Sequence, residues 1–118
     1  MILGTPDNIP VEQAAGYHGG QGPFLRRTLL DGVPGSVFKY VRDVTIPAGS
    51  AIGEHHHVND DEVFFIISGT GMMRVDGEEC RVGPGTAVLT LSGSVHSLRN
   101  DGPADLRIFV ACAKTSVG

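Results

Sequence analysis

Short apolar runs closed by turn residues divide most of the chain. From Val37 onward, β-branched and aromatic residues recur in short segments, and clusters of Gly, Pro, Asn and Asp end each of them. Asp76-Gly77 lies between two such segments, and this dipeptide is a strong signal for a two-residue hairpin turn. The pattern predicts about eight strands and no amphipathic helix, which favours an all-β sandwich or closed barrel. The expected strands cover 37–46, a short run ending at 57, then 63–67, 72–75, 78–82, 86–91, 95–100 and 106–112.

The first 36 residues lack this regularity, and we expect residues 1–36 to form an irregular or edge segment that packs on a barrel of residues 37–118. Pro10 can open a helical turn over 11–15 that ends at Gly16. The segment 16–23 holds too many glycines for a regular element. His18 within that segment could cover the barrel mouth as a lid, or it could be an ordinary turn residue.

Length and charge narrow the class of protein. A chain of 118 residues is one small domain, and its 9 basic and 13 acidic residues give a net charge of −4. This balance argues against a nucleic-acid-binding surface, which needs a basic excess. No apolar run approaches the length of a membrane span, and the N-terminus lacks the pattern of a signal peptide, so we expect a soluble cytoplasmic protein. Two cysteines, Cys80 and Cys112, are too few for a disulfide framework or a four-thiolate zinc site.

The histidines carry the candidate chemistry. On a strand, His55 and His57 point to one face and His56 to the other, so the first two imidazoles can bind one metal ion. A hairpin would bring the carboxylate of Glu62 beside them, and His96 could supply a fourth ligand in a barrel. Three imidazoles and a carboxylate suit one divalent transition metal ion per chain, Fe(II), Mn(II), Ni(II), Co(II) or Zn(II). The alternative interpretation of the triplet is a solvated surface loop.

The spacing of these residues resembles that of the cupin superfamily. The run Gly49-(5)-His55-x-His57-(4)-Glu62-(6)-Gly69 is similar to the first cupin motif at every fixed position. The run Gly85-(5)-Leu91-x-Gly93-(2)-His96-(3)-Asn100 is similar to the second motif at four of five positions, and Leu91 stands where the family usually has Pro. The resemblance implies a double-stranded β-helix, or jelly-roll barrel. It also implies that His55, His57, Glu62 and His96 are the metal ligands.

Residues in step with the candidate ligands are candidates for a substrate pocket. Phe64 and Ile66 alternate in phase with Glu62, and Leu98 is in phase with His96, so they could be pocket walls or ordinary core. Lys39 and Arg42 precede the metal motif and could bind a carboxylate or phosphate of a substrate. Cupins often carry Tyr just after the ligand Glu, and Phe64 and Phe65 stand in that region of this chain. We therefore expect a pocket with few acid–base groups.

Two functions remain open from the sequence. The first is a metal-dependent enzyme that acts on a small oxygen-rich metabolite, of dioxygenase, isomerase, cyclase or decarboxylase type, because four protein ligands leave coordination positions open. The second is a non-catalytic module that binds or senses a metal or small molecule. No catalytic residue is assigned. Open sheet edges also favour a homodimer, with the strands before Pro47 as the expected interface.

Overall fold

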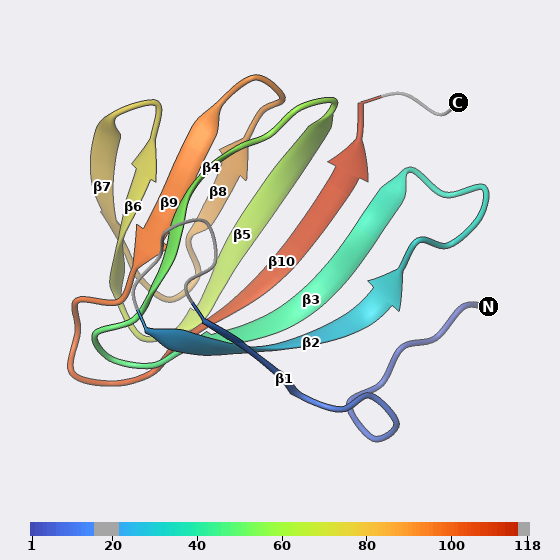
Figure 1. Cartoon of the computed structure of the whole chain (residues 1–118), viewed down its shortest axis with the longest axis horizontal. Coiled ribbons are helices and arrows are strands. Elements are labelled where there is room, and N and C mark those ends of the chain that lie inside the picture. The colour runs from blue at the N-terminus through green and yellow to red at the C-terminus, as the bar shows by residue number, and fades with distance from the viewer. Residues whose placement is uncertain (16–21, 116–118) are drawn as a thin grey trace.

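Ten strands and no helix form the described part of the chain, residues 1–15 and 22–115, in a computed structural model (Figure 1). The all-β prediction is confirmed. No helix in these residues is long and apolar enough to cross a membrane. The strands are β1 (Glu12–Ala15), β2 (Pro23–Asp31), β3 (Phe38–Ile46), β4 (Ala51–His56), β5 (Asp60–Ser68), β6 (Gly71–Val75), β7 (Glu78–Val82), β8 (Ala87–Thr90), β9 (Val95–Arg99) and β10 (Leu106–Lys114).

The strands form two antiparallel sheets that make a jelly roll. One sheet has six strands in the order β1-β2-β3-β10-β5-β8, and the other has four in the order β4-β9-β6-β7. Figure 1 shows the six-stranded sheet curving from β2 around to β5, with β4 and β9 on the side toward the viewer. Neighbouring strands are therefore often distant in sequence, as in the pairing of β10 with both β3 and β5.

The hydrophobic core lies between the two sheets. Alternate residues of each strand point inward, so one face of each sheet is apolar and buried. Burial of this apolar surface is the main stabilising term of the fold. The buried core residues are Phe24, Val44, Ile46, Ile52, Phe64, Ile66, Met73, Val82, Leu98, Leu106, Ile108 and Val110.

The N-terminal part is more regular than the sequence indicated. The helical turn expected over 11–15 is wrong, because β1 occupies this segment and pairs with β2. The nine-residue β2 continues the six-stranded sheet beyond β3, and its Phe24 is buried in the core. Its alternation is hidden because a register shift between Thr28 and Leu30 breaks the two-residue period. His18 and the rest of 16–21 lie outside the described residues.

Two glycine positions show why the turns need this residue. Asp76 and Gly77 have φ angles of 49° and 84° between β6 and β7, the left-handed pair that a type I′ hairpin requires. Asp76 also accepts a hydrogen bond at 2.9 Å from the backbone N–H of Val95. Gly69 has a φ of 84°, and a Cβ there would lie 2.3 Å from the carbonyl oxygen of Asp105. The hairpin that the sequence predicted at Asp76-Gly77 is confirmed by the pairing of β6 with β7.

Candidate metal centre

The four predicted ligands come from both sheets. His55 on β4 lies directly opposite His96 on β9, as a cross-strand pair. Glu62 is on β5 of the other sheet, and His57 follows the end of β4 in the connection to β5. A register shift between Ile52 and His55 bends β4 just before the histidines. The cluster therefore spans the two sheets at one end of the barrel interior.

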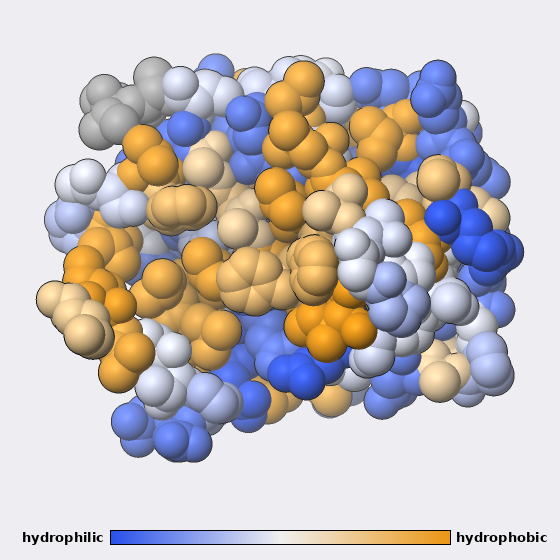
Figure 2. All heavy atoms as spheres, turned by 180° about the vertical axis from the view of Figure 1, so that it is seen from behind, coloured by the Kyte–Doolittle hydropathy of each residue, from blue (hydrophilic) through white to orange (hydrophobic). Residues whose placement is uncertain are grey.

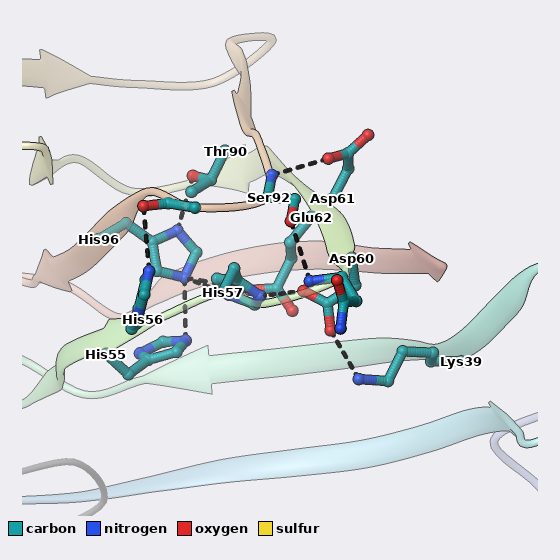
Figure 3. Close-up of polar contacts among 12 residues, drawn as sticks. Lys39, His55, His56, His57, Asp60, Asp61, Glu62, Thr90, Ser92 and His96 are labelled. Atoms are coloured by element: carbon teal, nitrogen blue, oxygen red, sulfur yellow. Dashed lines mark hydrogen bonds and ion pairs between the residues drawn. The ribbon is translucent and has the colours of Figure 1, made fainter. Parts of the chain in front are cut away.

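The ligand atoms of these residues converge on one point (Figure 3). Nε2 of His96 lies 3.0 Å from Nε2 of His55 and 3.0 Å from Nε2 of His57. Oε1 of Glu62 lies 3.0 Å from Nε2 of His57 and 3.1 Å from Nε2 of His96. The predicted assembly of His55, His57, Glu62 and His96 is present, and this group could hold a metal ion.

The far side of each imidazole ring is fixed by a hydrogen bond. Nδ1 of His55 donates to the carbonyl of Gly53 at 2.9 Å, and Nδ1 of His57 donates to the carboxylate of Asp60 at 2.6 Å. In the neutral rings this leaves the Nε2 atoms with lone pairs directed into the cluster. Nδ1 of His96 lies 2.7 Å from the hydroxyl of Thr90. Such outer partners orient the imidazoles that bind metals, so the donor set fits a divalent cation.

The charges of the cluster favour a cation. Burial alone would raise the pKa of Glu62, but hydrogen bonds from His57, His96 and Tyr40 outweigh it and hold this pKa below its ordinary value. A hydrogen bond to the Cys112 side chain and another to Glu62 raise the pKa of His57 to about 10, although burial opposes the rise. Both shifts show that the protein stabilises positive charge beside an ionised Glu62. A bound metal ion would supply that charge.

Tyr40 is a site residue that the sequence prediction missed. Its hydroxyl donates a hydrogen bond to Oε2 of Glu62, which leaves Oε1 to face the imidazoles. Burial, and then the negative charge of Glu62, raise the pKa of Tyr40, so the phenol keeps its proton. The contact follows from strand register, because Tyr40 pairs with Cys112 and Cys112 pairs with Glu62. The sequence signal was its position two residues before Arg42, on the same face of the strand.

Asp60 is a second missed residue, and it links the cluster to Lys39. Its Oδ1 accepts from His57, and its Oδ2 lies 2.6 Å from Nζ of Lys39. Burial opposes ionisation of Asp60, but the hydrogen bonds from Lys39 and His57 lower its pKa overall. Lys39 therefore has a carboxylate partner within the protein, although it also lines the neighbouring cavity.

A cavity of about 260 Å³ opens beside the cluster, and it contains some of the predicted pocket residues. Phe64, Lys39 and Arg42, which the sequence made candidates for a substrate pocket, line it. Ile66 and Leu98 do not, because both are fully buried in the core between the sheets. Ile66 and Leu98 are on the same faces of their strands as Glu62 and His96, as the alternation predicted, but the cavity does not extend as far as these two side chains. The complete lining is Phe24, Arg26, Lys39, Tyr40, Arg42, Val44, Ile52, His55, His56, His57, Asp60, Glu62, Phe64 and Val110.

His56 is separate from the metal cluster, as strand alternation predicted. It is exposed, and its Nε2 lies 3.0 Å from the carbonyl oxygen of Gly93. Figure 3 shows its ring apart from the point where the other three rings meet. It does reach the edge of the cavity lining.

Comparison with known proteins agrees with this geometry. A family model described as a cupin domain matches residues 42–112, more than half of the chain and all four candidate ligands. The chain belongs to the cupin family. Cupins commonly bind divalent metals, in agreement with the cluster found in this member of the family.

Two relatives and one solved structure show what this cupin is similar to. An oxalate-binding protein of Thermotoga maritima is 29% identical over 111 residues, which are 92% of this cupin and 90% of the relative. The tetracenomycin polyketide synthase protein TcmJ of Streptomyces glaucescens is 27% identical over 88 residues, which are 75% of this cupin and 59% of that protein. The crystal structure of a predicted oxalate decarboxylase from Thermotoga maritima has a TM-score of 0.90 and 25% identity, and the match covers 97% of this cupin and 99% of that chain.

Proposed function

We propose that this cupin holds one divalent transition metal ion at His55, His57, Glu62 and His96 and uses it to bind and convert a small carboxylate or oxoacid. The observation that supports this most strongly is the convergence of three Nε2 atoms and one carboxylate oxygen, all within 4.8 Å of one another and with four of their separations at 3.0–3.1 Å. Fe(II), Mn(II), Ni(II), Co(II) and Zn(II) all suit this donor set. When bound, such an ion would act as a Lewis acid toward an oxygen atom of the substrate.

The residues around the cluster prepare it for an oxygen-rich ligand. Tyr40 holds Oε2 of Glu62, so that Oε1 is the oxygen directed at the imidazoles. Four protein atoms leave room in the coordination sphere of an ion that takes six ligands. The protonated Tyr40 hydroxyl and the Phe64 ring both line the cavity beside this point. A substrate bound there would direct its oxygen atoms toward the metal cluster on one side. On the other side it would contact the aromatic side chains that line the cavity.

The cavity indicates a small anionic substrate. At about 260 Å³ it is below the usual range of about 300–1,000 Å³ for drug-sized ligands. Three cationic side chains, Arg26, Lys39 and Arg42, contribute to its lining. The relative from Thermotoga maritima is named for oxalate binding, a two-carbon diacid that meets both requirements. We therefore assign the substrate to the class of small carboxylates and oxoacids.

A non-catalytic binding protein is the second candidate. The name of the Thermotoga maritima relative specifies binding alone. The cavity also offers few groups for proton transfer, because Lys39 is bound to Asp60 and the Tyr40 hydroxyl already donates a hydrogen bond to Glu62. Binding and conversion share the same ligand class, so one experiment can first test binding and then test turnover.

We expect small carboxylates and oxoacids to stabilise the metal-loaded protein only. At a ligand concentration about 100 times Kd, the melting temperature should rise by about 10 °C, because ligand that binds only the folded state adds about 2.7 kcal/mol of stability. Thermal shift assays on metal-loaded and metal-stripped protein measure this, with oxalate, glyoxylate and pyruvate as probes. Equal shifts in both forms would contradict a metal-bound ligand.

Turnover of the same ligands separates the two candidate functions. Each ligand that binds is incubated with protein loaded with each of the five metals, in air and without oxygen, and products are followed by NMR. A product that His57→Ala protein does not form supports the enzyme. Binding without any product supports the binding protein.

We also propose that the cupin forms a homodimer through the outer face of the six-stranded sheet. The sequence placed the interface on strands before Pro47, and exposed apolar side chains occur there, at Val11, Leu25 and Phe38. We place the interface instead on a second group of exposed apolar side chains, which come from neighbouring strands of the six-stranded sheet. Figure 2 shows apolar side chains gathered across the back of the molecule. We define the outer apolar face as five residues that are each 38–55% exposed. Four of them are on β5, β8 and β10, and the fifth follows β8: Phe65, Ile67, Leu89, Phe109 and Leu91.

The composition of this face fits a second copy of the chain. Phe109 and Phe65 are paired across β10 and β5. The ion pair of Arg107 with Asp43, whose Nη2 and Oδ2 atoms are 2.8 Å apart, lies beside them, because Asp43 is the cross-strand partner of Phe109. An apolar centre with a polar rim is the usual anatomy of an interface. The five side chains expose on the order of 400 Å² of apolar surface, and a stable homodimer buries about 800 Å² per partner, of which roughly two thirds is apolar.

Light scattering should therefore find a dimer at micromolar concentration, and Leu89→Glu should convert it to a monomer because it places a charge in the apolar centre. Leu3→Glu is the control, since Leu3 is 75% exposed and lies outside this face. A monomeric unmodified protein would contradict the dimer. A Leu89→Glu protein that stays dimeric would place the interface elsewhere.

A further inference from the structure

The three cations that line the cavity differ in how their charge is balanced. Nζ of Lys39 lies 2.6 Å from Oδ2 of Asp60, and Nε of Arg26 lies 3.1 Å from Oε2 of Glu12. Each of these two side chains has a carboxylate partner within the chain. Both are therefore partly neutralised before any ligand arrives.

Arg42 is different, because its contacts are neutral. Its Nε donates to the hydroxyl of Thr28 at 3.1 Å, and its Cζ lies 3.7 Å from the centre of the Tyr40 ring. None of the ion pairs among the described residues includes Arg42. With Nε on Thr28, the two terminal nitrogen atoms of the guanidinium remain for an anion, and such a pair of donors matches a carboxylate.

The Tyr40 ring sets the position of this cation relative to the metal cluster. At one end of Tyr40 the hydroxyl donates to Glu62, and over its face lies the Arg42 guanidinium. Thr28 and Arg42 are also paired across β2 and β3, so the side chain is held from two sides. A single aromatic ring therefore separates the guanidinium from a metal-ligating carboxylate. A ligand that reaches the cluster through one end has Arg42 within the same cavity for its other end.

We propose that Arg42 binds a second carboxylate of the ligand, so that the site selects dicarboxylates over monocarboxylates. This inference rests on the proposed function, because one end of the ligand must reach the metal cluster. The first carboxylate is bound at the cluster of His55, His57, Glu62 and His96. The second forms a charge-assisted pair with the terminal nitrogen atoms of Arg42. Arg42 thus determines specificity, whereas the four ligands provide binding of any carboxylate.

The test compares each diacid with its half-amide, which keeps length and shape but carries one carboxylate less. Oxalate, malonate and succinate are titrated against metal-loaded protein by calorimetry, beside oxamate, malonamate and succinamate. At least one diacid should bind about tenfold or more tightly than its half-amide. Arg42→Gln should weaken that diacid about 10- to 100-fold and leave the half-amide unchanged, and Arg42→Lys should retain part of the preference. Arg74→Gln removes an exposed positive charge outside the cavity lining and should change neither.

The outcomes separate this inference from the proposed function. If every diacid and half-amide binds equally and Arg42→Gln changes neither, Arg42 is not the second anchor, while metal-dependent carboxylate binding stands. If Arg42→Gln weakens both members of a pair equally, or lowers the metal content, Arg42 acts through Tyr40 and Glu62, and the inference is again overturned. If no carboxylate binds the metal-loaded unmodified protein, the proposed function itself fails.

Discussion

His57→Ala will abolish stoichiometric metal binding, whereas His56→Ala will retain it. The Nε2 of His57 lies within 3.0 Å of both Glu62 and His96, and alanine removes this donor together with its link to Asp60. Loss of an outer partner alone typically lowers metal affinity about 10- to 100-fold, so loss of a ligand should exceed about 100-fold. Elemental analysis of protein purified without chelator or nickel resin measures the metal content directly.

His56 is a matched control because it is a neighbouring histidine outside the cluster. Its alanine variant removes the same side chain from an exposed position, where Nε2 contacts the Gly93 carbonyl. Circular dichroism must show that both variants keep their sheet content. Full metal content in the His57→Ala protein would exclude this set of ligands. Equal loss in both variants would mean that the triplet is not arranged as an extended strand.

Leu98→Ala will lower the free energy of unfolding by about 2–5 kcal/mol without weakening ligand binding to metal-loaded protein. Leu98 is fully buried between the sheets, so its truncation removes apolar contacts and leaves a void. It does not line the cavity, so the contacts to the ligand remain. Urea unfolding followed by circular dichroism gives the change in stability, and the thermal shift assay gives ligand binding.

Leu3→Ala controls for leucine truncation at an exposed position, where the change should stay within about 0.5 kcal/mol. The sequence allowed Leu98 to be a pocket wall, and this experiment decides between wall and core. Weaker ligand binding with nearly unchanged stability would restore the pocket interpretation.

The sequence predicted the strands best where turns and alternation agree. The hairpin at Asp76-Gly77 and the strands after Val37 follow directly from local residue preferences. The strand β2 was missed because a register shift interrupts its alternation and two arginines stand near its centre. Its regularity comes from pairing with β3, a contact between segments that local pattern does not reveal.

The spacing of residues along the sequence made the candidate metal ligands predictable. It did not make the side chains that hydrogen-bond to these ligands predictable. His55 and His57 share a face by strand period, and Glu62 follows one turn later. Tyr40 reaches the site only through the register of strands far apart in sequence, and the same kind of register places Thr90 beside Glu62. Glu62 pairs with Thr90 on one side and with Cys112 on the other, and Cys112 pairs with Tyr40. A single sequence contains no record of those registers.

The row of Tyr40, Cys112, Glu62 and Thr90 across β3, β10, β5 and β8 constrains how this protein can evolve in length. Strand side chains alternate between faces, so inserting or deleting one residue inside any of these strands would turn that member of the row toward the opposite face. Glu62 would then leave the interior, and the imidazoles would lose their carboxylate. The turn that joins β9 to β10, residues 100–105, contributes no residue to the row. Changes of chain length among descendants of this sequence should therefore accumulate in such turns and be absent from the four strands of the row.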